Sequence, residues 1–342
     1  MREVSKGKIK IGQIGVGHVH AAGKMEALRR LSDIFEVVGV AEPDPVWREK
    51  NGGKAVYNDL PWMTEEQLLN TPGLQAVAVE NDEFDLVPTA SRCIAAGMHI
   101  HLDKPGGETL PPFREMLAEA GRKKLTVQLG YMYRTNPAIR FCLQAVREGW
   151  LGQIFEVHAV MSITQDKNAR EWLARYKGGN MYIFGGHLID LALSMLGKPD
   201  NITPYQRRTQ PEKDDLYDNG FAVLEYPKTV VSIRSSAIEV EGFSRRQLVV
   251  CGDQGTIDIR PIEPPHHRLT ESPKLRMALA QPRGGFQAGY QEVPLPPLGK
   301  RYDAQLIEFA RIVRGEIENP YTLEHELLVQ ESLLKACGYP IQ

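Results

Sequence analysis

Short apolar runs alternate with helical patterns through the first 130 residues of the chain. The runs are rich in β-branched residues and have the length of buried parallel strands. Segments with apolar residues at helical spacing follow several of them. Such alternation predicts a doubly wound parallel sheet, so we expect an α/β domain at residues 1–130. The expected strands are 9–14, 35–41, 75–80, 98–102 and 125–129, and the expected helices begin at Ala21, Leu86 and Pro111.

The pattern changes after Gly130, where strand-like segments follow one another with few helices between them. We expect a second, α+β domain at residues 131–342 with a mostly antiparallel sheet. Residues 172–179 are predicted to form a loop, and the proline-rich residues 261–299 a long irregular excursion. The expected strands are 154–163, 220–226, 229–237, 247–252 and 256–260, and the expected helices are 136–148, 186–196, 302–314 and 323–337.

Composition agrees with two folded domains and argues against several classes of partner. The 342 residues fit two domains of ordinary size. The net charge of -2 gives no reason to expect nucleic acid or an anionic membrane as a partner. No apolar run approaches the ~20 residues of a membrane helix, and the N-terminus has no apolar signal core, so we expect a cytoplasmic protein. The four separated cysteines are expected to be reduced thiols.

Residues 8–21 combine a strand, a glycine turn and the start of a helix, which is the context of a dinucleotide-binding loop. Gly15 lets the chain turn tightly, and Gly17 lets the backbone approach a pyrophosphate that the N–H groups at the helix start would hold. His20 stands where the third glycine of the full motif is expected. The alternative is a glycine turn that binds no ligand. The other residues of the expected loop are Val16, His18 and Val19.

Polar residues follow the ends of the predicted parallel strands, where the ligands of such sheets bind. Glu42 comes near the offset at which an acidic group accepts hydrogen bonds from an adenosine ribose. An acidic group would repel a 2′-phosphate, so we expect NAD rather than NADP. The alternative is that Glu42 only opens the turn at 43–45. Further strand ends are followed by Asn81, Lys104 and Gly130, which are expected to line the same crevice.

Lys104 and His187 are the candidate catalytic residues. Lys104 lies beside the expected cofactor, where a lysine can donate a hydrogen bond to a substrate hydroxyl or relay its proton. His187 begins a helix after two glycine pairs, and Asp190, three residues on, is placed to orient the ring. A solvated lysine and a core histidine bonded to the backbone are the alternatives.

Several other residues are weaker candidates. An aromatic and basic set is expected to line a polyol pocket, and packing or surface charge is the alternative. The histidines around the nucleotide crevice have no cysteine or acidic set to complete a site, so no metal is expected. The pocket set is Tyr133, Arg134, Trp172 and Tyr176, and the crevice histidines are His18, His20, His99 and His101. His266 and His267, in the excursion, are expected to be solvated.

Together these motifs resemble the glucose–fructose oxidoreductase / inositol dehydrogenase (Gfo/Idh/MocA) family over nearly the whole chain. The loop at 15–20 is similar to the family's nucleotide loop, and Asp103-Lys104-Pro105 to its Glu-Lys-Pro motif. The resemblance implies an N-terminal Rossmann domain whose cofactor contacts include Asp103 and Lys104. It also implies a C-terminal domain for substrate binding and oligomerisation, with His187 and Asp190 at the substrate. The further similar segments are 130–134, 178–190 and 252–256.

Two departures from the family pattern affect this interpretation. The family commonly has an aspartate four residues before the histidine, and here that position is Ile183. Acid/base work therefore falls to Lys104 and His187. The usual Thr-x-Pro-Asn-x-x-His stretch is replaced by residues 79–85, which keep Asn81 but lack the histidine. This second departure predicts a changed substrate pocket.

The sequence thus predicts an NAD(H)-dependent oxidoreductase that moves a hydride between nicotinamide and a ring carbon of a sugar, glycoside or cyclitol. The family resemblance implies the sugar-type substrate and a homodimer or homotetramer. Two alternatives stay open. One is an enzyme that uses NAD transiently in elimination or glycoside cleavage, and the other is a non-catalytic nucleotide-binding sensor.

Overall fold

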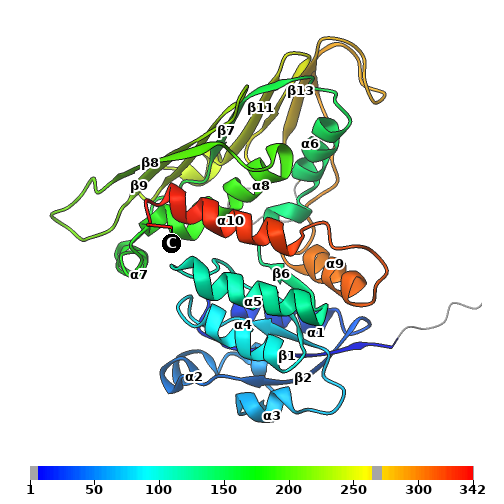
Figure 1. Ribbon diagram of the computed structural model, residues 1–342, viewed down its shortest axis with the longest axis vertical. Coiled ribbons are helices and arrows are strands. Elements are labelled where there is room, and N and C mark those ends of the chain that lie inside the picture. The colour runs from blue at the N-terminus through cyan, green and yellow to red at the C-terminus, as the bar shows by residue number, and fades with distance from the viewer. Residues whose placement is uncertain (1–6, 264–271, 342) are drawn as a thin grey trace, which may run out of the picture. The chain divides into compact units, whose positions relative to one another are not determined.

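The computed structural model describes residues 7–263 and 272–341 (Figure 1), so His266 and His267 lie outside the described residues. The chain divides into two compact units. Unit 1 contains Met1–Gly130 and Tyr302–Leu327, and unit 2 contains Tyr131–Arg301 and Leu328–Gln342. The sequence placed all residues after 130 in one domain, whereas the structure returns 302–327 to the first unit.

Unit 1 is built on a six-stranded sheet in the order β3-β2-β1-β4-β5-β6, and its neighbouring strands are parallel. The order reverses beside β1, which places a ligand-binding switch point at the carboxyl ends of β1 and β4. The predicted doubly wound sheet is confirmed. The strands are β1 (Ile9–Ile14), β2 (Phe35–Ala41), β3 (Trp62–Met63), β4 (Ala76–Val79), β5 (His99–Leu102) and β6 (Val127–Leu129).

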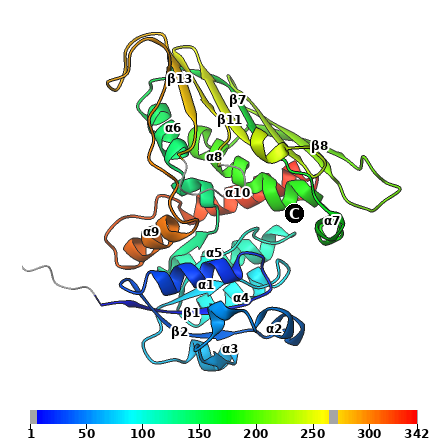
Figure 2. The same ribbon diagram turned by 180° about the vertical axis from the view of Figure 1, so that it is seen from behind.

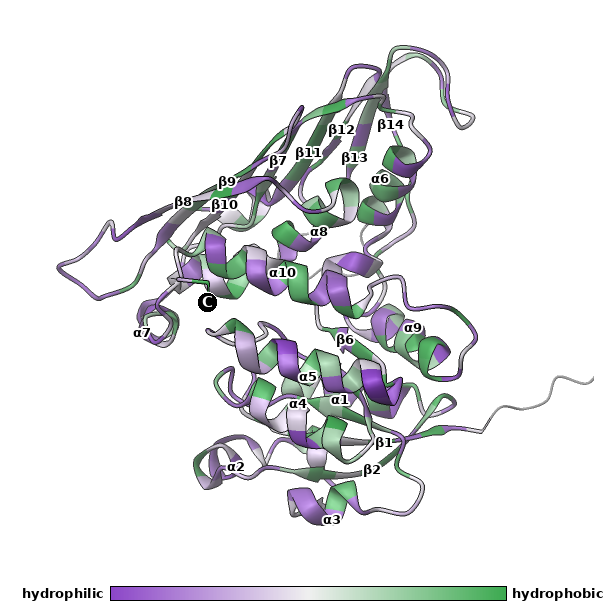
Figure 3. Cartoon of the chain, in the orientation of Figure 1, coloured by the Kyte–Doolittle hydropathy of each residue, from purple (hydrophilic) through white to green (hydrophobic). Residues whose placement is uncertain are grey.

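Helices cover both faces of this sheet because its strands are apolar on both sides. On one face, Ile9 and Ile11 of β1 pack with Leu28 of α1 and with Leu306 and Phe309 of α9. On the other face, Leu68 of α3 packs directly on Gly12. Figure 2 shows α1 and α9 next to each other, and Figure 3 shows the mixed hydropathy of α4 and α5. The helices are α1 (Ala21–Arg30), α2 (Pro45–Asn51), α3 (Glu65–Leu69), α4 (Leu86–Ala95), α5 (Leu110–Lys123) and α9 (Asp303–Val313), with the 3-10 helix η1 (Ala55–Tyr57).

Unit 2 contains an eight-stranded sheet in the order β14-β13-β12-β11-β7-β10-β9-β8. Only the β7–β10 pair is parallel among the described strands of this sheet, so the prediction of a mostly antiparallel sheet is confirmed. The strands are β7 (Ile154–Val160), β8 (Asn201–Arg207), β9 (Asn219–Glu225), β10 (Val230–Ser236), β11 (Gln247–Gly252), β12 (Gly255–Ile259), β13 (Leu275–Leu279) and β14 (Gly289–Glu292).

Helix α8 forms the centre of the unit 2 core, because its first eight residues are all buried. It packs on β7 and β10 and against α6. A five-residue π-helix, η3 (Met181–Gly185), leads directly into it. The other helices are α6 (Pro137–Arg147), α7 (Lys167–Leu173) and α10 (Leu323–Ala336), which continues from unit 1 into unit 2, with the 3-10 helices η2 (Met132–Thr135) and η4 (Gly242–Arg245).

Two predictions for unit 2 were wrong. Residues 261–299 are not irregular throughout, because β13 and β14 form a hairpin that extends the sheet. Alternate residues of β13 are buried, so this strand has the period of a half-covered sheet. The expected loop at 172–179 also begins inside α7, whose start is capped by the Asp166 carboxylate accepting from the Ala169 N–H. No described helix is long and apolar enough to cross a membrane.

Candidate functional site

The glycine turn after β1 brings the backbone of β1 against the end of β4. Gly15 has a φ of +96°, and a Cβ on it would lie 2.2 Å from the Asn81 nitrogen. A Cβ on Gly17 would lie 2.9 Å from the Asp82 nitrogen and 3.1 Å from the Trp47 ring. Both positions therefore require glycine, one for its dihedral angle and both for close approach. The two glycines therefore let the turn pack closely against the end of β4, and their role at a pyrophosphate stays a prediction.

Glu42, at the end of β2, joins the glycine turn to the turn that follows β2. One carboxylate oxygen accepts from the Val16 N–H at 2.6 Å, and the other accepts from the Asp44 N–H at 2.9 Å. Burial raises the pKa of Glu42 above its usual value, against the effect of these two hydrogen bonds. Each oxygen keeps a second lone pair for a ribose hydroxyl. The two interpretations of Glu42 from the sequence, turn residue and ribose acceptor, are therefore compatible.

Asn81 follows the end of β4 and lies immediately beside Gly15. Its side chain is buried, and its Oδ1 has no hydrogen-bond partner in the part of the chain that the structure describes. A buried amide oxygen without a donor is costly unless a ligand or water supplies one. Val19, by contrast, is 74% exposed at the surface of the loop.

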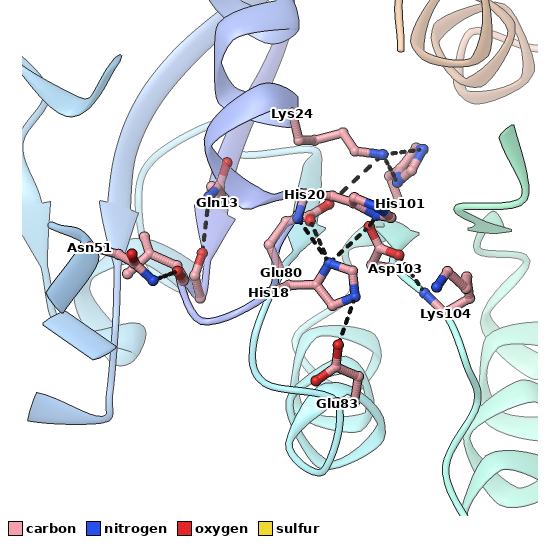
Figure 4. A network of polar contacts seen from close by, with 12 residues as sticks. Gln13, His18, His20, Lys24, Asn51, Glu80, Glu83, His101, Asp103 and Lys104 are labelled. Carbon is pink, nitrogen blue, oxygen red and sulfur yellow. Dashed lines mark hydrogen bonds and ion pairs between the residues drawn. The ribbon is translucent and has the colours of Figure 1, made fainter. Parts of the chain in front are cut away.

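Behind the turn lies a buried ionic cluster, drawn in Figure 4, that joins the loop after β1 to the ends of β4 and β5. Asp103 Oδ2 lies 3.0 Å from His20 Nδ1 and 3.4 Å from His18 Nδ1. The other ring nitrogen of His18 lies 3.2 Å from Glu83. Lys24, on α1, lies 3.8 Å from Glu80. The sequence had missed Lys24, Glu80 and Glu83, because their proximity depends on the packing of α1 over two strand ends.

Burial and mutual charge shift the acid–base properties of this cluster. Burial raises the pKa of Glu80 to about 8, and the Asp103 charge acts in the same direction. Burial also lowers the pKa of His20 to about 3. For His18, burial alone would lower the pKa, but Asp103 and Glu83 raise it above its usual value. Strongly shifted groups that share one crevice are typical of functional sites.

Lys104 follows β5 directly and is 4% exposed. Its backbone N–H donates to Asp103 Oδ1 at 2.8 Å, which fixes the carboxylate relative to the strand end. Unit 1 therefore brings together the glycine turn, Glu42, Asn81 and Lys104, which the strand-end argument named, and Asp103, which the family resemblance implied. Their roles stay predictions.

In unit 2, His187 is the second residue of α8 and is 3% exposed. Its ring packs edge-on against Tyr131 and tilted against Tyr133, with ring centroids 5.5 and 5.3 Å apart. Ile183 lies in the π-helix that precedes α8 and is buried. Single π-turns of this kind are frequent at functional sites.

Asp190 has a partner that the sequence did not indicate. It forms a buried two-pronged ion pair with Arg134, with distances of 2.7 and 3.0 Å to the guanidinium nitrogens. The helical spacing had suggested an orienting role toward His187 for Asp190, and hydroxyl binding for Arg134. The pairing shows that each of them neutralises the other's charge inside the unit.

Tyr133 is held by residues that the sequence analysis did not consider. Its hydroxyl donates to Glu263 Oε1 at 2.8 Å, and Arg246 pairs with the same oxygen at 2.5 Å. Burial, followed by the Glu263 charge, raises the pKa of Tyr133. Trp172, the remaining pocket candidate, packs against Tyr176, whose ring stacks on Tyr182.

The parallel sheet of unit 1 and its glycine turn define an α/β protein with a Rossmann-like half. Residues 139–258 match the family model described as the GFO/IDH/MocA C-terminal domain. The chain therefore carries the C-terminal domain of the Gfo/Idh/MocA family, and the resemblance seen in the sequence motifs is confirmed.

Individual relatives agree with this family. The chain is 24% identical over 288 residues to trans-1,2-dihydrobenzene-1,2-diol dehydrogenase of Bos taurus, covering 77% of this chain and 84% of the relative. Its fold matches a UDP-N-acetylglucosamine 3-dehydrogenase from Acidithiobacillus ferrooxidans, with a TM-score of 0.77, 16% identity and 97% of each chain covered. It also matches a protein from Desulfitobacterium hafniense provisionally described as an NADPH-dependent oxidoreductase, with a TM-score of 0.80, 17% identity, and 97% and 95% coverage. These names support an oxidoreductase.

Proposed function

We propose that the protein is an NAD(H)-dependent oxidoreductase that moves a hydride to or from a ring carbon of a sugar, glycoside or cyclitol. The observation that carries the proposal is the set of strand ends in unit 1, where two obligatory glycines and the Glu42 carboxylate lie beside an amide oxygen of Asn81 that has no donor among the described residues. This set suits a dinucleotide: the glycine turn leads into the start of α1, where a pyrophosphate binds in such sheets, and the carboxylate suits a ribose diol.

The residues proposed to hold the cofactor lie in the loop after β1 and at the ends of β2, β4 and β5. When bound, the cofactor supplies the acceptor or donor of a hydride. The Glu42 carboxylate accepts hydrogen bonds from the ribose hydroxyls and repels a 2′-phosphate, which favours NAD over NADP. Asn81 accepts a hydrogen bond that its Oδ1 otherwise lacks. The proposed set is Gly15, Val16, Gly17, His18, Val19, Glu42, Asn81, Asp103 and Lys104.

Lys104 and His187 are proposed to transfer the proton of the reacting substrate oxygen. Lys104 donates a hydrogen bond to the reacting oxygen of the substrate and relays its proton. His187 acts as the partner acid/base. Tyr133, Trp172 and the Arg134–Asp190 pair are proposed to line the substrate pocket. We also expect a homodimer or homotetramer, as the family resemblance implied, which light scattering measures.

A second function deserves a test because of Ile183. This buried apolar side chain occupies the place of the aspartate that the family pattern led us to expect. An enzyme without that carboxylate suits a reaction in which bound NAD would serve only as a transient hydride acceptor, so that an adjacent C–H of the oxidised substrate would become acidic enough for elimination or glycoside cleavage. The hydride then returns, and no NADH is released.

The decisive experiment measures NADH absorbance with NAD⁺ or NADP⁺ against sugars, glycosides and inositols, while mass spectrometry follows the products. A rise with NAD⁺ supports the dehydrogenase, and a rise only with NADP⁺ contradicts the argument from Glu42. Cleaved product without NADH supports the transient oxidation. Nucleotide binding with unchanged substrate across the panel supports a sensor.

The first substitution to make is Lys104→Ala. We expect turnover to be abolished while the cofactor dissociation constant stays within a few fold, because the lysine acts on the substrate oxygen. The matched control is Lys10→Ala, a partly exposed lysine on β1, which should keep full turnover. Near-normal turnover of the Lys104→Ala variant would refute the proposed mechanism.

A further inference from the structure

The loop after β1 and the end of β5 bring two imidazoles and a carboxylate to one point. The ligating atoms of His18, His20 and Asp103 all lie within 4.8 Å of one another. Asp103 Oδ2 is 3.0 Å from His20 Nδ1 and 3.4 Å from His18 Nδ1. Ligand atoms around a tetrahedral Zn²⁺ with bonds of about 2.0–2.2 Å lie about 3.3–3.5 Å apart. We propose that His18, His20 and Asp103 bind a divalent transition-metal ion, of which Zn²⁺ is the best match.

His18 has the orientation of a metal ligand, because one ring nitrogen faces the proposed ion site and the other faces a carboxylate. Its Nε2 lies 3.2 Å from Glu83, and its Nδ1 faces Asp103. Histidines that bind metals usually have a carboxylate or another acceptor beside their second ring nitrogen. The His20 backbone N–H donates to His18 Nδ1 at 3.2 Å, and the same nitrogen faces Asp103. An arriving ion replaces this long hydrogen bond.

Asp103 is oriented for the same purpose. Its Oδ1 accepts from the Lys104 N–H at 2.8 Å, so the carboxylate is fixed with Oδ2 toward both imidazoles. Figure 4 shows His18 and His20 on the loop facing Asp103 from one side. A ligand set of two histidines and one carboxylate suits Zn²⁺, Fe²⁺ or Co²⁺ and leaves a coordination position open.

Glu80 provides a second and independent indication of a bound cation. It is fully buried, and neither carboxylate oxygen has a hydrogen-bond partner among the described residues. Its Oε2 lies 4.0 Å from His18 Nδ1. Its contact with Lys24 is long, at 3.8 Å, and the Lys24 ammonium also lies 3.4 Å from a ring nitrogen of His101. A buried carboxyl group whose two oxygens make no hydrogen bond is costly in either protonation state, and a divalent ion bound beside it compensates the ionised form.

The ion connects two parts of unit 1 that the proposed chemistry depends on. His18 and His20 follow the glycine turn, and Asp103 immediately precedes Lys104. Binding therefore fixes the nucleotide loop to the strand end that carries Lys104. The site was not expected from the sequence, because Asp103 is 83 residues from His20 and only the packing of β1, β4 and β5 brings the acidic groups to the histidines.

The test is a titration of the EDTA-treated full-length protein with Co²⁺, which replaces Zn²⁺ and gives visible d–d absorption. We expect one Co²⁺ per chain and competition by Zn²⁺. His20→Ala and Asp103→Asn should weaken binding at least tenfold, and Glu83→Gln about 10–100-fold. The control is His158→Gln, a half-buried histidine of unit 2 bonded to Ser232, which should leave the titration unchanged.

Two results would overturn the proposal. One is the absence of stoichiometric Co²⁺ absorption in the unsubstituted protein, a measurement that does not depend on any variant folding. The other is binding that His20→Ala and Asp103→Asn leave intact while circular dichroism shows both variants folded. Nucleotide binding and turnover are measured separately, so failure of the metal site is distinguishable from failure of the proposed activity.

Discussion

At the scale of single residues, Gly15 is a position where the fold leaves no room for a Cβ atom. Gly15→Ala adds a Cβ 2.2 Å from the Asn81 nitrogen, at a φ of +96°. Backbone strain alone costs about 1–2 kcal/mol, and displacement of the β4 end adds to it. We expect the free energy of unfolding to fall by more than about 2 kcal/mol in urea titrations. Nucleotide binding should be lost, because the crevice is displaced.

Gly97→Ala separates these two contributions. Gly97 has a similar φ of +84°, but a Cβ on it meets nothing within 4 Å. This variant should lose only the ~1–2 kcal/mol of backbone strain and keep its nucleotide affinity. Equal destabilisation of the two variants would mean that the backbone dihedral angle, and not the closeness of Asn81, is what requires glycine at position 15.

Local motifs predicted the residues of the unit 1 crevice because strand ends and glycine turns are short-range features. Glu42, Asn81 and Lys104 each follow a strand whose apolar run is visible in the sequence. The partners of Tyr133 were not predictable in this way. Glu263 lies 130 residues from Tyr133, and no periodicity connects them. Helical spacing correctly placed Asp190 on α8, but it could not show that Arg134 is its partner.

At the scale of elements, α9 tests the assignment of residues 302–327 to unit 1. Phe309 is fully buried, packs in the cluster with Ile9 and Ile11, and meets the His101 ring edge-on at 5.9 Å. Phe309→Ala should lower the free energy of unfolding by about 3–5 kcal/mol, because it leaves a cavity against the sheet. Chemical denaturation followed by circular dichroism measures this loss.

The control lies on the same helix. Ile307 is 37% exposed, so Ile307→Ala removes little buried surface and should cost under about 1.5 kcal/mol. A similar loss in both variants would mean that the buried contact of Phe309 with the sheet is not what α9 contributes, because alanine raises helix propensity at either position. Hydrogen exchange at β1 and β2 should accelerate only in the Phe309→Ala variant.

Elements were predictable where they are long and periodic, and were missed where they are short. The sequence analysis missed α3, which has five residues and only one buried side chain, Leu68. Its capping box, Thr64 with Gln67, was the available signal. The sequence could not show that α9 belongs to unit 1. The apolar face of an amphipathic helix predicts that the helix packs on a core, but it does not identify the sheet.

At the scale of the whole molecule, the pH dependence of stability reflects carboxylates that are paired in the folded state. Arg170 binds Asp214 through two hydrogen bonds of 2.7 and 2.8 Å and Asp218 through a third of 3.0 Å. The Arg170 hydrogen bonds lower the pKa of Asp214 below its usual value. A carboxylate with a lowered folded pKa stabilises the protein above its unfolded pKa, and this contribution disappears as pH falls through the folded value.

Asp214→Asn should therefore lower the free energy of unfolding by about 1–3 kcal/mol at pH 7, because a charge-assisted pair is lost. The difference from the unsubstituted protein should shrink as pH falls below the unfolded pKa of about 3.9, because Asp214 then binds a proton in the unfolded chain that the paired carboxylate of the folded state does not. Urea unfolding at pH 7, 5 and 3 measures the trend. Asp215→Asn is the control: the Asp215 side chain is 85% exposed in its pair with Arg208, so the cost should stay within about 0.5 kcal/mol at every pH. A loss for Asp214→Asn that does not change with pH would show that packing of the side chain, and not its charge, stabilises this part of unit 2.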